Sequence, residues 1–243
     1  MKHFIKGGWP IYGIPLGIIM LNCKFPRPIG DIGHARTFSF PVAYEVLYNV
    51  DPQDLTVNNN PEAIGILLNA AEKLEKLGVG AIMTSCGLLL RYQKQLASIV
   101  KIPVATSSLL LLPLIGNIIS AEKKVAVICS KSSNLSIDTI KEFVNWDIDR
   151  LIIDGLENCK NFNRIINNQQ PPYEMDINII YFELLELCRN LINQEPDIAM
   201  LLLECTNLGP FSNRLSIDLG LPVFDFKQLA YILQMAIPSS EKV

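Results

Sequence analysis

Apolar positions along this chain follow two different periods, and the two periods alternate. Compact apolar runs of strand length occupy residues 17–23 (GIIMLNC) and 124–130 (KVAVICS). In residues 177–193 (INIIYFELLELCRNLIN) the apolar positions instead recur every three or four residues, which is typical of an amphipathic helix. Strands that alternate with helices predict parallel sheets with helices on both faces.

The clearest predicted helix lies between residues 60 and 78. Asn60 has a side chain that can cap a helix, and Pro61 suits its first turn. Apolar residues from position 64 to position 74 share one face, and Gly78 is a residue that commonly ends a helix.

The second half of the chain repeats the first half around a cysteine. Residues 85–107 (SCGLLLRYQKQLASIVKIPVATS) align without a gap with residues 204–226 (ECTNLGPFSNRLSIDLGLPVFDF), so that Cys86 falls on Cys205, 119 positions later. Each copy has the pattern of a buried strand, a cysteine turn, a helix, a short loop and a strand. A repeat of about half the chain predicts two similar α/β halves rather than a solenoid.

We therefore expect an α/β protein of two pseudo-symmetric domains, each a parallel sheet flanked by helices. The first domain is predicted at residues 1–104 plus 220–243 and the second at residues 105–219. Ligands of such sheets bind beyond the carboxyl ends of the strands, where both cysteines are predicted. The active site is expected in the cleft between the domains.

Two long segments fall outside this pattern. Residues 24–41 are rich in Pro and Gly and are too long for an ordinary connection. They are either a lid on the side of the site, with Arg27 and Arg36 as carboxylate partners, or a variable surface insertion. Residues 154–172 are polar and rich in Asn, and we interpret them as a second surface loop.

Composition excludes several classes of function. A net charge of −3 with scattered basic residues gives no electrostatic basis for binding nucleic acid or an anionic membrane. Six cysteines without a C-x-x-C pair, and only His3 and His34, disfavour both a disulfide scaffold and a zinc site. Apolar runs are too short to span a membrane, so a cytoplasmic protein is expected. No phosphate-binding loop or serine elbow is present.

Cys86 and Cys205 stand out because they occupy equivalent places in the repeat. Each precedes a helical segment, whose first N–H groups and dipole stabilise a thiolate. One thiol on each side of a cleft suits removal of a proton from one face of a carbon and delivery to the other, with coupled titrations. Of the other cysteines, Cys188 is predicted to pack in a helix, whereas Cys23 and Cys129 either pack or line the site.

"TSCGLL", followed half a chain later by "LECTNLGPF", resembles the cofactor-independent aspartate/glutamate (and hydantoin) racemase superfamily. "RPIGDIG" and "TFSFPV" resemble an uncharacterised branch of it. The resemblance covers nearly the whole chain and implies two α/β halves, no cofactor, a small-molecule carboxylate substrate and a homodimer. It implies that Cys86 and Cys205 are the acid/base pair. The substrate-binding candidates are Thr84, Ser85, Gly87, Thr206, Asn207, Ser130, Ser132 and Arg27.

The sequence also departs from the glutamate racemases. These enzymes have an acidic residue after the first strand and a histidine two residues after the second cysteine, where this chain has Asn22 or Cys23 and Asn207. Our leading hypothesis is a PLP-independent racemase or epimerase of a small amino acid or related carboxylate. The alternatives are an isomerase or decarboxylase that uses one cysteine, and a non-catalytic carboxylate-binding protein.

Overall fold

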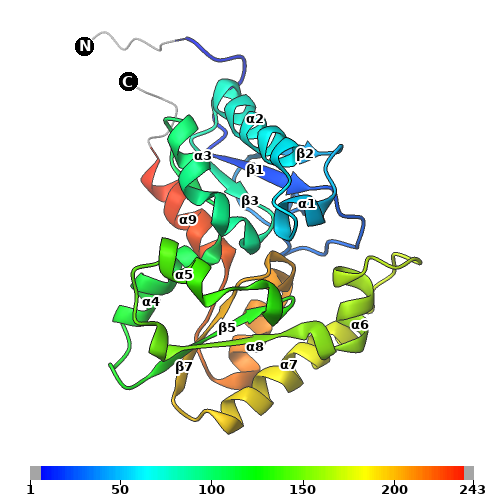
Figure 1. The fold of residues 1–243 in the computed structure, drawn as a ribbon, viewed down its shortest axis with the longest axis vertical. Helices are drawn as coiled ribbons and strands as arrows, with labels where there is room; N and C mark the ends of the chain where they lie inside the picture. Colours follow the sequence, from blue (N-terminus) through cyan, green and yellow to red (C-terminus); the bar gives the residue numbers. More distant parts are fainter. Residues whose placement is uncertain (1–6, 238–243) are drawn as a thin grey trace.

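The computed structural model describes residues 7–237, which form two four-stranded sheets. The first sheet has the order β2-β1-β3-β4 and the second the order β6-β5-β7-β8, and all of the paired strands are parallel. In Figure 1 the first sheet lies above the second, and helices flank both. The predicted fold class is therefore confirmed.

The first four strands of the chain form the first sheet, and the last four form the second sheet in the corresponding order. The strands are β1 Leu16–Leu21, β2 Val42–Leu47, β3 Ala81–Thr84, β4 Val104–Ala105, β5 Lys124–Cys129, β6 Leu151–Gly155, β7 Ile198–Leu203 and β8 Val223–Phe224. The α-helices are α1 Pro52–Thr56, α2 Pro61–Leu77, α3 Gln93–Ile99, α4 Leu112–Asn117, α5 Ile137–Phe143, α6 Lys160–Phe162, α7 Ile177–Gln194, α8 Ser212–Leu219 and α9 Phe226–Ala236.

The predicted helix ends of α2 are confirmed. The Asn60 side chain accepts hydrogen bonds from the backbone N–H groups of Glu62 and Ala63. Gly78 ends the helix with a φ of 95°, a left-handed conformation that favours glycine. The helix predicted in residues 177–193 is also present, as α7.

The repeat is visible as matched turns after β3 and β7. Each cysteine is followed by a 3₁₀ segment, η1 Gly87–Tyr92 in the first copy and η7 Thr206–Phe211 in the second, and α3 and α8 follow these. The sequence predicted a helix at both places, and the structure shows that its first turns are wound more tightly.

The prediction of a surface loop over residues 154–172 is wrong. This segment contains the end of β6, short helical turns and a five-residue π-helix, Asn163–Asn167. Phe162 and Ile165 are almost fully buried in the core of the second half. These two apolar side chains order the segment in spite of its high content of polar residues.

One cluster of buried apolar side chains extends across both halves, and it includes Leu16 and Met83 of the first sheet together with Val127 and Leu202 of the second. Helix α9 follows β8 of the second sheet but contacts β1 and β3 of the first. The predicted domain division stays a prediction, and its outer ends, residues 1–6 and 238–243, lie outside the described residues. None of the helices in residues 7–237 is long and apolar enough to cross a membrane.

Two substitutions in α2 are expected to have opposite effects on stability. Leu67 is fully buried, so Leu67→Ala should lower the free energy of unfolding by about 2–5 kcal/mol. Gly65 is exposed and a Cβ there would have no neighbour within 4 Å, so Gly65→Ala should raise it by about 0.5–1 kcal/mol. Denaturation in urea measures both, and equal effects would contradict the packing described for this helix.

Candidate active site

The two cysteine turns lie where the strand order of each sheet reverses. In the first sheet β1 has β2 on one side and β3 on the other, so the reversal point lies between β1 and β3. Cys23 follows β1 and Cys86 follows β3. In the second sheet Cys129 ends β5 and Cys205 follows β7. Four cysteines therefore occupy the carboxyl ends at which ligands of open parallel sheets bind.

A hydrogen bond joins the two turns directly. The Thr206 hydroxyl donates to the backbone carbonyl oxygen of Ser85 at 2.6 Å, and both residues are buried. A second link lies close by, where the Ser108 hydroxyl donates to the Leu203 carbonyl at 2.9 Å. The residues before Cys86 and after Cys205 are therefore held in contact across the two halves.

The side chains of Thr84 and Ser85 form hydrogen bonds that hold the turn before Cys86 in place. The Thr84 hydroxyl donates to the Thr106 carbonyl at 2.6 Å, and the Ser85 hydroxyl accepts from the Leu21 N–H at 2.9 Å. Both residues are buried. The first bond joins the end of β3 to the residue after β4, and the second joins it to β1. A contact of either side chain with a substrate stays a prediction.

A chain of polar contacts connects the long loop of residues 24–41 to the second cysteine. The Arg27 guanidinium is paired with Asp31 at 2.7 Å. The other carboxylate oxygen of Asp31 accepts from the Asn207 side-chain amide at 2.8 Å. The amide oxygen of Asn207 accepts from the Cys205 thiol at 3.4 Å.

Asp31, which is 1% exposed, was not among the predicted site residues. Its only signal in the sequence is an acidic residue within the "GDIG" of the long loop. Arg27, proposed as a carboxylate partner, has Asp31 as its partner, while Arg36 is exposed. Gly30 of the same loop lies directly against Pro210, because a Cβ at Gly30 would be 2.6 Å from the Pro210 Cα atom. The loop is therefore packed on the turn that follows Cys205.

Glu204 is the second site residue that sequence reasoning missed. It immediately precedes Cys205, is 2% exposed, and its Oε1 atom has no hydrogen-bond partner. Burial raises the pKa of its carboxyl group to about 8. The available signal was a charged residue placed directly after the continuous apolar strand IAMLLL, where burial is expected.

Burial also dominates the titration of the two thiols. It raises the pKa of Cys86 to about 12, with a further rise from Glu204, and it raises the pKa of Cys205 well above its usual value for the same two reasons. The predicted stabilisation by the helical segments is present, because the N–H groups of Leu88 and Asn207 lower the pKa of the neighbouring thiol. Burial outweighs it in both cases.

The remaining predicted residues lie at the ends of β1 and β5 and in the helices. Cys188 is fully buried in α7 and packs in the core, as predicted. The Cys129 thiol donates to the Asp154 carbonyl at 3.4 Å, and its pKa is raised by burial and by Glu204. Ser132 donates its hydroxyl hydrogen to Glu157, whereas the Ser130 carbonyl accepts from Asn167. The binding roles of Ser130 and Ser132 stay predictions.

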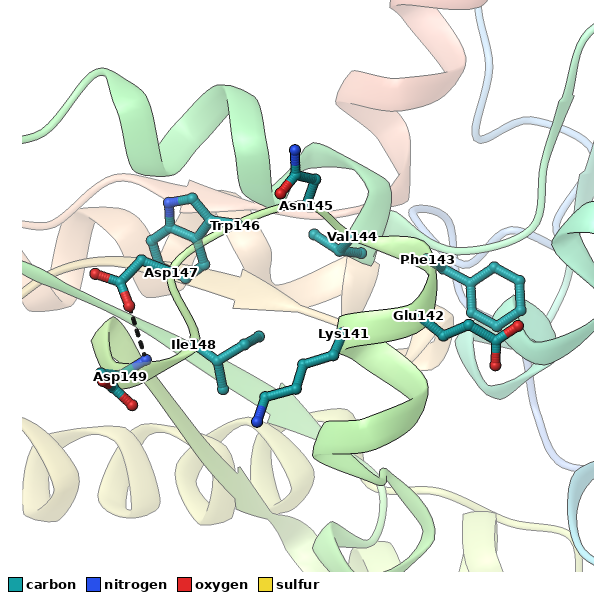
Figure 2. Close-up of a pocket in the computed structure, with 9 residues that line it drawn as sticks. All are labelled: Lys141, Glu142, Phe143, Val144, Asn145, Trp146, Asp147, Ile148 and Asp149. Atoms are coloured by element: carbon teal, nitrogen blue, oxygen red, sulfur yellow. Dashed lines mark hydrogen bonds between the residues drawn. The ribbon is translucent and has the colours of Figure 1, made fainter.

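Figure 2 shows a surface hollow elsewhere in the second half, lined by residues 141–149. One continuous segment forms it, and Asp147 there accepts a hydrogen bond from the Asp149 N–H. None of the predicted site residues lines this hollow. Within residues 7–237, no group of three or more His, Cys, Asp and Glu side chains has the arrangement of a metal site.

The fold agrees with that of solved enzymes over nearly their whole length. The chain superposes on a mutant of arylmalonate decarboxylase with a TM-score of 0.56 at 17% identity, covering 91% of this chain and 94% of that one. Picrophilus torridus aspartate racemase gives 0.54 at 16% identity, covering 93% and 97%. The chain has the aspartate/glutamate racemase fold. The resemblance noted in the sequence is thereby confirmed for the fold.

Curated proteins that are similar to this chain are named after a different activity, that of a lyase. The chain is 29% identical to a dimethylsulfoniopropionate lyase of Durusdinium sp. clade D, over 86% of this chain and 70% of that protein. It is 27% identical to dimethylsulfoniopropionate lyase 7 of Emiliania huxleyi, again over 86% of this chain. The chain spans 63% of that second relative, which is less than two thirds of its length. No family model matches the chain.

The hydrogen bond between the two turns gives a testable energy. Thr206→Val keeps the shape of the side chain but leaves the buried Ser85 carbonyl without this donor, which should lower the free energy of unfolding by about 1–3 kcal/mol. Thr206→Ser retains the hydroxyl and is the matched control. Denaturation in urea compares the two variants, and a Val variant as stable as the Ser variant would contradict a structural role for this bond.

Proposed function

We propose that the chain is a thiol-dependent enzyme that removes a proton from the carbon next to a carboxylate, in an elimination from a β-sulfonio carboxylate such as dimethylsulfoniopropionate. The observation that carries the first part is the direct contact between the two cysteine turns, at the carboxyl ends of both sheets. The names of the similar curated proteins support the second part.

The elimination needs one base. A thiolate at Cys86 or Cys205 takes the proton from the carbon next to the substrate carboxylate, and the electrons of that C–H bond form a carbon–carbon double bond. The bond between the β-carbon and the sulfonium sulfur breaks with both electrons on sulfur. The products are dimethyl sulfide and acrylate, and the proton held by the cysteine is released to solvent. The sulfonium group leaves as a neutral molecule, so no acid is needed to protonate it.

A buried thiolate suits this first step. A proton next to a carboxylate is only weakly acidic, so its removal requires a strong base, and a thiol whose pKa is raised gives a more basic thiolate. Burial raises the pKa of both cysteines here. The same burial reduces the fraction of thiolate, so the site also needs a way of accommodating the charge.

A racemase or epimerase of a small amino acid or related carboxylate is the second candidate. The specific observation in its favour is that the two thiols follow equivalent strands of two similar halves. Stereoinversion requires one thiolate to remove the proton and the opposite thiol to return one. Both cysteines would then be needed for any turnover.

Substitution of each cysteine separates these candidates. Dimethylsulfoniopropionate, amino acids, hydantoins and small dicarboxylates are each supplied in D₂O under reducing conditions. Proton NMR follows loss of the α-proton and new products, and gas chromatography measures dimethyl sulfide. For the elimination we expect equal amounts of dimethyl sulfide and acrylate, with a loss of about 10²–10⁴-fold when the cysteine that acts as base is changed to Ser.

Cys159→Ser is the matched control, because Cys159 lies outside both cysteine turns and its thiol contacts the Glu183 carbonyl. It should retain the activity. Loss of an α-proton signal without a new product, abolished equally by Cys86→Ser and Cys205→Ser, would replace the elimination with stereoinversion. No turnover of any compound in the panel would overturn the proposal of an enzyme and favour a carboxylate-binding protein.

A further inference from the structure

Glu204 places a carboxyl group in the site that neither reaction scheme uses. Its position is fixed by the second sheet, because its backbone N–H donates to the Ile128 carbonyl at 2.8 Å. The residue is 2% exposed and its Oε1 atom is buried without a hydrogen-bond partner. Burial of a polar atom without a hydrogen-bond partner costs free energy, so the position of this carboxyl group calls for an explanation.

The carboxyl group of Glu204 reaches across to the turn of the other half. A Cβ atom at Gly87 would lie 2.7 Å from the carboxyl carbon of Glu204 and closer still to Oε1. No side chain fits at position 87 while the carboxyl group occupies its place. Gly87 therefore allows a carboxyl group from the second half to lie beside Cys86 of the first half.

The charge of Glu204 acts on the titration of three thiols. An ionised carboxylate raises the pKa of Cys86, Cys205 and Cys129, and in each case it is the largest cause after burial. The other charges that act on these thiols are distributed around them: Cys23 and Arg91 act on Cys86, and Glu157 and Asp154 act on Cys129. For Glu204 itself, burial is the cause of the raised pKa.

We propose that Glu204 exchanges the thiol proton with Cys86 and Cys205, so that the site carries one negative charge shared between one carboxyl group and two thiols. Glu204 is a positioning residue in this scheme, since it acts on the substrate only through a thiol. The inference deepens the proposed function, and it rests on that function for the use of the thiolate but not for its formation.

The exchange balances in protons and charge. The S–H bond of a cysteine breaks, an O–H bond forms on the Glu204 carboxylate, and the negative charge moves from oxygen to sulfur. The thiolate then takes the substrate proton. After the elimination both groups are protonated, and release of one proton to solvent restores the single charge. Two negative charges in so buried a place would repel each other, so the transfer of a proton between the groups is favoured over loss of a second proton.

This sharing predicts a distinctive dependence on pH. Below the pKa of Glu204, which is about 8, the thiolate fraction rises tenfold for each pH unit. Above it, the charge already resides mainly on Glu204, and the thiolate fraction levels off until much higher pH. In Glu204→Gln no carboxylate competes for the charge, so the thiolate fraction continues to rise.

Alkylation by iodoacetamide, without substrate, measures this at each cysteine separately. Peptide mass spectrometry gives the rate constants of Cys86 and Cys205 between pH 6.5 and about 10, the range that brackets the Glu204 pKa. We expect at least one of the two thiols in the unsubstituted protein to flatten near pH 8, and the same thiol in Glu204→Gln to keep rising and to react at least about tenfold faster at pH 10. Profiles of the same shape in the two proteins would overturn the proposal.

A second measurement does not depend on the folding of a variant. In the unsubstituted protein, infrared difference spectra should show a protonated carboxyl band at pH 7 that disappears with a midpoint near pH 8. A carboxyl midpoint that differs from the pH at which the thiol reactivity levels off would contradict the sharing, because the two changes would then be separate titrations. Because neither measurement uses turnover, failure of this inference and failure of the proposed reaction are separate outcomes.

Discussion

The geometry of the site depends on the contact between the two cysteine turns. The Thr206 hydroxyl donates to the Ser85 carbonyl. If the end of β7 moved away from the end of β3, this buried carbonyl would lose its hydrogen bond, at a cost in free energy. The close approach of the Glu204 carboxyl group to Gly87 adds a steric constraint at the same junction. Two halves that share an apolar core are thus also joined by polar groups at the place where the thiols lie.

Burial has two consequences that act against each other. It excludes water from the thiols and raises their pKa, which makes each thiolate more basic but rarer. The neighbouring N–H groups of Leu88 and Asn207 offset this only in part. The Glu204 carboxyl group has a raised pKa for the same reason, and its charge acts on both thiols, so the titrations of the three groups are coupled.

Fold and reaction are separate conclusions for this chain. Similarity to aspartate racemase and arylmalonate decarboxylase, at 16–17% identity, establishes the fold, with its arrangement of sheets and helices. It does not choose among reactions, because enzymes of one fold differ in the groups that surround the reacting atoms. In this chain the surroundings of Cys205 include Asp31 from the long loop, which is connected to the thiol through Asn207.

The sequence by itself determined the alternation of strands and helices, the capped ends of α2 and the equivalence of Cys86 and Cys205, because all three depend on local periodicity and on spacing. Only the tertiary structure decided that residues 154–172 form ordered turns. Phe162 and Ile165 pack in the core there, although most of their neighbours in the sequence are polar. The tertiary structure also decided the surroundings of the thiols. Asp31 and Glu204 appear in the sequence as ordinary charged residues, and only the packing of one half against the other buries their carboxylates beside the cysteines. The chemistry of a buried group depends on neighbours that are distant in the chain, and no local pattern records them.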